Sequence, residues 1–174
     1  MTAELNLSPY TLFRSIVEAA HVADQKGYWP DEQPIGESAA EHMLRFLSLL
    51  CAGDGDINPR ELEVFDALFA AAGERQPADY LRELVASTAD SIGEDPDELS
   101  DFLTETPPYL DAIMDMDRAE GTRATSRCVA SLSGLALAIL AADGREEVEE
   151  HAIFTTHIGH LRRELDQAGL NAED

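Results

Sequence analysis

Residues 46–65 read FLSLLCAGDGDINPRELEVF, and residues 135–154 read LALAILAADGREEVEEHAIF. In both segments a run of apolar and small residues leads into Asp-Gly, an acidic stretch follows, and a second run with helical apolar spacing begins. Identical residues recur at an offset of 89 positions, namely Asp54 and Asp143, Gly55 and Gly144, Glu61 and Glu150, and Phe65 and Phe154. Because one helical hairpin cannot bury its own apolar face, we expect the two units to pack against each other.

Helix-capping signals extend this pattern over the rest of the chain. Helix starts are predicted at Ser8-Pro9, at a Ser38/Glu41 capping box, at Asn58-Pro59, at Pro77, at Asp95-Pro96 and at Thr106-Pro107, the helix after Thr106 running to about Met116. Two long helices are expected at about 123–142 and 147–167, and no segment alternates as a strand would. The chain is therefore predicted to be one all-α helical-bundle domain over residues 1–174, with repeat 1 at about 38–73, a helical insert at about 76–121 and repeat 2 at about 123–168.

The charge balance restricts the kinds of partner. The 174 residues include 35 Asp plus Glu against 12 Lys plus Arg, a formal net charge of -23. Such a chain repels phosphate backbones and anionic membrane surfaces, so neither nucleic acid binding nor direct membrane insertion is expected. Divalent cations and basic protein surfaces are favoured instead. The alternative is that the acidity only confers solubility.

The cysteines and the N-terminal residues predict a cytoplasmic protein. Cys51 and Cys128 are isolated within apolar helical runs, as buried reduced thiols are, although the sequence leaves a disulfide between them open. The N-terminal MTAELNLSPY lacks the basic and apolar regions of a signal peptide. The longest apolar run, 135–142, is much shorter than a membrane span.

The two Asp-Gly turns have a structural and a functional interpretation. Gly after a helix, Asn58 as an N-cap and Glu61 in a capping box account for the residues without any ligand. The same segments carry oxygen ligands suited to Ca²⁺ or Mg²⁺, namely Asp54, Asp56, Asn58 and Glu61 in one copy and Asp143, Glu146, Glu147 and Glu150 in the other. The first copy matches only the last part of an EF-hand loop, because Leu50 and Ala52 occupy the positions of its first two ligands.

The repeated unit also resembles a known family. Its two copies, CAGDGDINPRE and LAADGREEVEE, are similar to the TerB-like family, which includes tellurite-resistance TerB proteins and the N-terminal domain of a membrane-anchored DnaJ-like protein. The resemblance covers residues 38–73 and 123–165, and Gly53 departs from it by replacing a common Ala. It implies paired helical hairpins, with Asp54, Glu61, Asp143 and Glu150 as candidate metal ligands, and a link to tellurite resistance, stress responses and membrane-associated or phage-defence assemblies.

These observations predict a cation-binding or cation-responsive stress-response scaffold without catalytic residues or an organic cofactor. The alternative is a metal-independent adaptor that docks a basic protein partner through its acidic surface. Such a partner could be membrane-associated. Catalytic motifs such as GxSxG, a P-loop or HExxH are missing. His157 and His160 share a helix face and are interpreted as partly exposed histidines rather than metal ligands. The cluster of Asp111, Asp115 and Asp117 is interpreted as a solvated helix face. Trp29, with Tyr28 and Ile35, is interpreted as part of a Pro-rich loop that covers the core, the alternative being an anchor for a partner.

Overall fold

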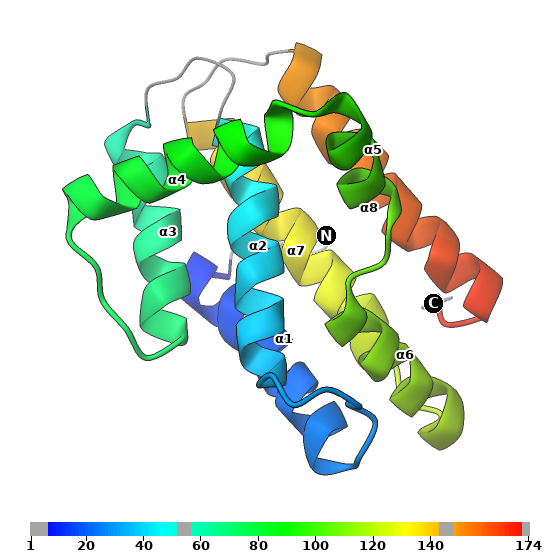
Figure 1. Ribbon diagram of the computed structural model, residues 1–174. Helices are drawn as coiled ribbons and strands as arrows, with labels where there is room; N and C mark the ends of the chain where they lie inside the picture. The colour runs from blue at the N-terminus through cyan, green and yellow to red at the C-terminus, as the bar shows by residue number, and fades with distance from the viewer. Residues whose placement is uncertain (1–6, 52–56, 143–147, 172–174) are drawn as a thin grey trace, which may run out of the picture.

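The computed structural model describes residues 7–51, 57–142 and 148–171, and every regular element in these ranges is an α-helix. The helices are α1 (Pro9–Gln25), α2 (Ile35–Cys51), α3 (Pro59–Ala71), α4 (Ala78–Gly93), α5 (Pro96–Thr104), α6 (Pro108–Glu120), α7 (Ala124–Ala142) and α8 (Val148–Ala168). The predicted all-α class is confirmed (Figure 1).

Three predicted helix starts have the caps that the sequence indicates. The Ser8 hydroxyl accepts a hydrogen bond from the Thr11 amide at 3.3 Å at the start of α1. Asn58 forms the capping box with Glu61 at the start of α3. The Asp95 carboxylate accepts from the amides of Asp97 and Glu98 at the start of α5. Local capping chemistry alone defines these boundaries.

Two predicted boundaries were wrong. α2 begins at Ile35, not after Ser38, because Ile35 is fully buried and the Pro34 carbonyl accepts from the amides that follow it. Thr106 does not cap α6, which starts at Pro108 and continues to Glu120. Core contacts of Ile35 therefore outweigh the local capping box at Ser38, and the Thr106 hydroxyl pairs with His160 at 3.3 Å instead.

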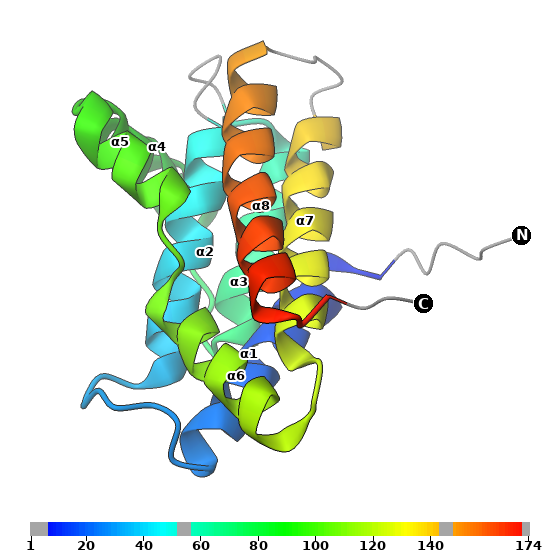
Figure 2. The same cartoon turned by 90° about the vertical axis from the view of Figure 1, so that its right-hand side faces the viewer.

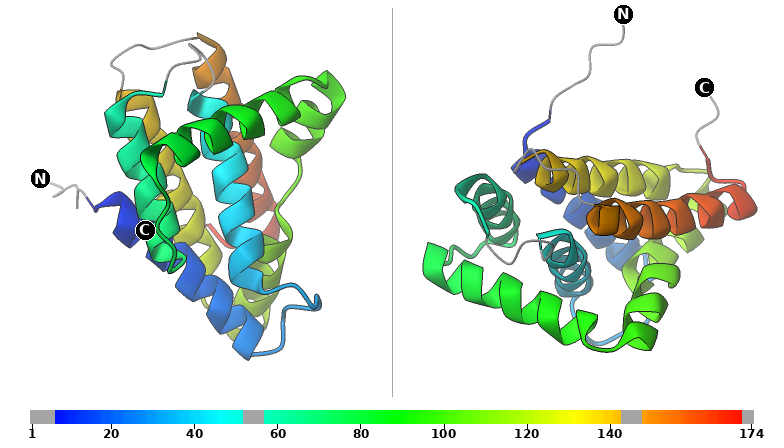
Figure 3. Two further views of the ribbon diagram at one scale, coloured as in Figure 1. Left: turned by 60° about the vertical axis from the view of Figure 1, so that its left-hand side comes forward. Right: turned by 90° about the horizontal axis from the view of Figure 1, so that it is seen from above.

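α7 lies at the centre of the bundle and packs against α1, α2, α3, α6 and α8. Figure 2 shows α7 and α8 side by side, with α1 and α6 packing against α7 below. Seen from above, α4 lies on the far side of α2 and α3 from α7 (Figure 3). Every described helix except α5 contributes fully buried residues to one main core.

The length and composition of α7 would suit a membrane span, which the short run at 135–142 did not suggest. Half of its most apolar window is buried inside the fold, where it contacts five other helices. A core helix of a globular domain has these properties, so α7 does not indicate a membrane protein. The predicted burial of the two thiols is confirmed, since Cys51 and Cys128 are both buried.

Candidate functional site

Most of the predicted cation ligands lie outside the described residues. Asp54, Asp56, Asp143, Glu146 and Glu147 belong to this group. The others are described, and Asn58 and Glu61 cap α3: the Asn58 side chain accepts from the amides of Arg60 at 2.9 Å and Glu61 at 3.1 Å. Glu61 accepts in return from the Asn58 amide at 2.7 Å. The capping interpretation of these two residues is confirmed, and cation binding stays a prediction.

Glu61 and Glu150 occupy equivalent positions in their helices. Each is the third residue of its helix, and each side chain is buried, with 5% of its surface exposed. The C-terminal ends of α2 and α7 and the N-terminal ends of α3 and α8 all lie at one end of the bundle (Figure 1). Within the described ranges, His, Cys, Asp and Glu side chains form no group of three that could hold a metal ion.

A buried pair of histidines was not predicted. His42 of α2 and His157 of α8 approach each other through their Nε2 atoms at 2.9 Å. The other ring nitrogens also have partners: Nδ1 of His42 lies 3.2 Å from the Tyr109 hydroxyl of α6, and Nδ1 of His157 lies 3.1 Å from the Leu103 carbonyl of α5. His157 is fully buried, so its interpretation as a partly exposed residue was wrong.

These contacts define one arrangement of protons. A carbonyl only accepts, so Nδ1 of His157 donates to Leu103 and Nε2 of His157 accepts from His42. Nδ1 of the neutral His42 then accepts from the Tyr109 hydroxyl. Every ring nitrogen is satisfied while both imidazoles are neutral. Burial lowers the pKa of His157 to about 4, and burial, His157 and Arg45 lower the pKa of His42 well below its ordinary value.

The signal for this pair was present but local to each helix. His42 and His157 each occupy an apolar helix face, next to Phe46 in α2 and Leu161 in α8. A cavity of about 240 Å³ adjoins His42 and is also lined by Glu41, Arg45, Phe102 and Glu105. The apolar neighbours of each histidine were a signal for a core position, but nothing in the sequence indicates that the two meet, because they lie 115 residues apart.

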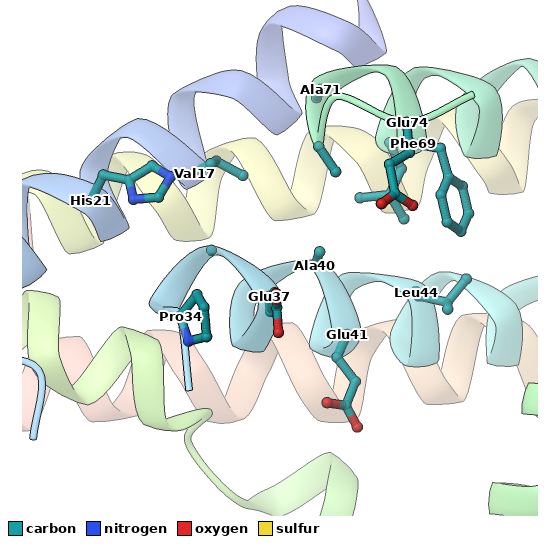
Figure 4. A pocket seen from close by; sticks show the side chains of 13 residues that line it. Val17, His21, Pro34, Glu37, Ala40, Glu41, Leu44, Phe69, Ala71 and Glu74 are labelled. Atoms are coloured by element: carbon teal, nitrogen blue, oxygen red, sulfur yellow. The ribbon is translucent and has the colours of Figure 1, made fainter. Parts of the chain in front are cut away.

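A larger groove of about 520 Å³ lies between α1, α2 and α3. Figure 4 shows Val17 and His21 of α1, and Phe69 and Ala71 of α3, facing α2 across the opening. Its apolar lining comes from residues on all three helices: Val17, Ala40, Leu44, Leu68, Phe69, Ala71 and Ala72. A concave, mostly apolar surface with a few polar groups is the usual form of a binding site.

Carboxylates accompany this apolar lining. Glu37, Glu41 and Glu74 line the groove, and all three are exposed. No ion pair between described residues involves any of them. Gly36 leaves room for His21, since a Cβ at this position would lie 3.3 Å from the His21 ring. The groove therefore combines exposed apolar surface with negative charge that the described residues do not neutralise.

Asp117 is the one acidic residue of the 111–117 cluster that the structure buries fully among the described residues. Its carboxylate accepts from the amides of Ala124 at 2.9 Å and Thr125 at 2.8 Å and from the hydroxyls of Thr122 and Thr125, so it caps α7. Burial raises the pKa of Asp117, but these hydrogen bonds outweigh it and the pKa is lowered. Asp111 and Asp115 are exposed as predicted, but the prediction that Asp117 also lies on a solvated face was wrong.

The predicted covering loop is also confirmed. Trp29 packs against the core, and its indole N–H donates to the Gln33 carbonyl at 2.7 Å. Trp29 and Tyr28 are partly buried, as residues of a covering loop are.

Comparison of the chain with protein-family models, curated proteins and solved structures gave no significant match.

Proposed function

We propose that this chain is a non-enzymatic binding module that docks a basic, amphipathic helix of a partner protein in the groove between α1, α2 and α3. One observation carries the proposal: apolar side chains and exposed carboxylates meet in a single depression of about 520 Å³. This proposal develops the adaptor alternative that the acidic composition favours.

The apolar lining determines what kind of segment fits. Val17, Leu44 and Phe69 come from three different helices, so the depression is elongated along α2 and open to solvent. An amphipathic helix inserts its apolar residues into such a groove at i, i+3, i+4 and i+7 spacing. Each large apolar side chain removed from water contributes about 1.5–3 kcal/mol, which offsets the entropy lost on docking.

The charges determine the sign of the partner. Glu37 and Glu74 lie on opposite sides of the groove, one on α2 and one just after α3. Lysine or arginine on the polar face of a docked helix would pair with both. The net charge of -23 adds long-range attraction for a basic partner and repels an acidic one.

The test uses a fluorescently labelled, lysine-rich peptide with leucines at i, i+3, i+4 and i+7, and a second peptide in which glutamates replace the lysines. Titration with the protein should raise the anisotropy of the basic peptide only, and added salt should weaken binding. The double variant Glu37→Lys/Glu74→Lys should bind at least about tenfold more weakly, or about 1.4 kcal/mol.

A matched control separates the groove from the overall charge. Glu149→Lys/Asp166→Lys changes the net charge by the same amount at exposed positions of α8, which does not line the groove. This variant should bind the basic peptide nearly as well as the parent chain does. Equal weakening in both double variants, or binding of the acidic peptide, would refute docking at the groove.

A shape-only variant adds an independent check. Gly36→Leu places a side chain where His21 and Val17 border the groove, without changing any charge. His21 is exposed and free to move, so the fold should tolerate the substitution. We expect weaker peptide binding with unchanged salt dependence.

The cation-responsive scaffold remains a second proposal, supported by the equivalent buried positions of Glu61 and Glu150 at one end of the bundle. The TerB resemblance adds a stress-response setting, in which the docked partner belongs to a membrane-associated assembly. Docking at the groove does not depend on a cation, since the groove residues lie in other parts of α2 and α3.

A further inference from the structure

We propose that α5 is a pH-dependent cover, which lies over the His42–His157 pair at neutral pH and leaves it when the pair takes up protons at mildly acidic pH. This inference is independent of the groove. It rests on three observations: α5 packs over the two imidazoles, their hydrogen bonds require both rings to be neutral, and α5 has few other buried contacts.

α5 packs over both rings, and His157 is 0% exposed while His42 is 8% exposed beside the adjoining cavity. The Phe102 ring is stacked on His157 with ring centroids 5.6 Å apart, and its centroid lies 5.6 Å from that of His42. The Leu103 carbonyl accepts the Nδ1–H of His157. His157 is 0% exposed, so water cannot solvate a charge on its ring unless Phe102 moves, and protonation of His157 is therefore coupled to displacement of α5.

An additional proton on the pair disrupts its chain of hydrogen bonds. A proton on Nε2 of His157 would face the N–H of His42 at 2.9 Å. The chain accepts it only if His42 moves its own proton to Nδ1, so that Tyr109 becomes the acceptor and its hydroxyl proton loses its partner. A second proton would place two N–H groups and two positive charges in contact, so the closed arrangement excludes it.

The neighbouring charged groups oppose a protonated imidazole while α5 covers the pair, or would stabilise one after α5 has moved away. Arg45 of α2 and His160 of α8 oppose a positive charge on the rings, and Arg45 itself lies over Phe102 at 4.8 Å. Tyr109 of α6 has a raised pKa because of burial and the nearby Cys128 of α7, so it stays neutral. Glu41 and Glu105 line the adjoining cavity, where they would stabilise an exposed imidazolium.

α5 is the helix least anchored to the core. Leu103 is its one buried residue and belongs to a small cluster with Leu49 and Ile92, separate from the main core, against which the partly buried Phe102 packs. Arg45 and Glu98 form an ion pair at 3.5 Å, which contributes little because both side chains are partly solvated. Segments with few buried contacts open locally at a lower cost than the rest of the fold.

Hydrogen exchange at pH 7 and pH 5 tests this cover, with rates corrected for the intrinsic effect of pH. An imidazole with an ordinary pKa near 6.5 when exposed, and a much lower pKa when covered, favours the open form by about 20-fold over this interval. Two imidazoles give about 400-fold. We expect the protection of amides in α5 to fall by at least about 20-fold, while α1 and α7 change much less.

Two variants assign the effect to the buried pair. His157→Gln removes one titrating ring and should reduce the response of α5 to about that of one imidazole. His151→Gln, on the exposed face of α8, should leave the response unchanged. The proposal would be overturned if the protection of α5 amides were unchanged at pH 5, or if all helices lost protection equally. If His157→Gln fails to fold, the measurement on the parent chain alone decides between these outcomes.

Discussion

α2 contributes residues to both the histidine pair and the acidic groove, but the polar groups at the two places are in opposite environments. At the pair, each ring nitrogen of His42 and His157 has a partner and aromatic rings exclude water. At the groove, Glu37 and Glu74 are exposed beside apolar surface, without an ion pair to any described residue. Satisfied and buried polar groups stabilise a fold, whereas unneutralised charge beside exposed apolar surface is available to a partner.

The comparison predicts the largest loss of stability at Asp117, because it is a buried polar group whose hydrogen bonds are made within the fold. Asp117→Ala leaves the amides of Ala124 and Thr125 without their acceptor in a site that is 1% exposed. We expect the free energy of unfolding to fall by about 3 kcal/mol. Urea denaturation measures this. A loss below about 1 kcal/mol would show that the cap is dispensable.

The histidine pair predicts a pH-dependent stability. Both imidazoles have lowered pKa values in the folded chain and ordinary ones near 6.5 in the unfolded chain. Their contribution is therefore complete above pH 6.5 and is lost as the pH falls toward about 4, where the folded His157 takes up its proton. Between pH 6.5 and 5 the loss should be about 1.6 kcal/mol for each ring.

Denaturation at several pH values checks this, with His157→Gln as the variant that halves the slope. The lowered pKa of Asp117 acts in a different window, because its contribution is lost only below the ordinary pKa of an aspartate. Stability that stays level from pH 7 to pH 5 would contradict the buried neutral pair.

The Asp-Gly segments predict a smaller effect of cations. Millimolar Ca²⁺ at ten times its Kd would add about 1.4 kcal/mol to the free energy of unfolding, or a rise of about 3–6 °C in Tm. Thermal scans in EDTA, Ca²⁺ and Mg²⁺ measure it. The Asp54→Asn/Asp143→Asn variant should lose the rise while keeping the turn chemistry. A normal fold with no shift in any cation would leave these residues with capping roles alone.

The groove carboxylates should affect stability least. Glu37→Gln and Glu74→Gln remove exposed charges that have no ion pair among the described residues, so each should change the free energy of unfolding by less than about 0.5 kcal/mol. Chemical denaturation of the two variants measures this. A loss above 1 kcal/mol would assign these residues to the fold and weaken their role in docking.

The sequence predicted correctly those helix boundaries that depend on residues close to one another in the chain. Asn58 with Glu61 and Asp95 with Pro96 cap helices where the sequence indicated, because capping chemistry acts within a few residues. The start of α2 was missed because the burial of Ile35 depends on tertiary contacts. The sequence therefore predicts the fold class and most helix boundaries.

The candidate sites were harder to predict for the same reason. His42 and His157 meet across two helices that are distant in sequence. The groove joins Val17 of α1 to Phe69 of α3 across α2, so no spacing along one segment reveals it. The acidic composition predicted a basic partner but not the surface that would receive it. The positions of the histidine pair and of the groove depend on contacts between helices that are distant in the sequence.

The most direct test of docking at the groove is a map of where the basic peptide binds. Backbone amide signals of the ¹⁵N-labelled chain would be followed while the lysine-rich amphipathic peptide is added. The account predicts that the shifts concentrate on the groove, at residues such as Val17, Ala40, Leu44 and Phe69, and that α8 changes little. Shifts spread evenly over the acidic surface, or concentrated away from α1, α2 and α3, would contradict it.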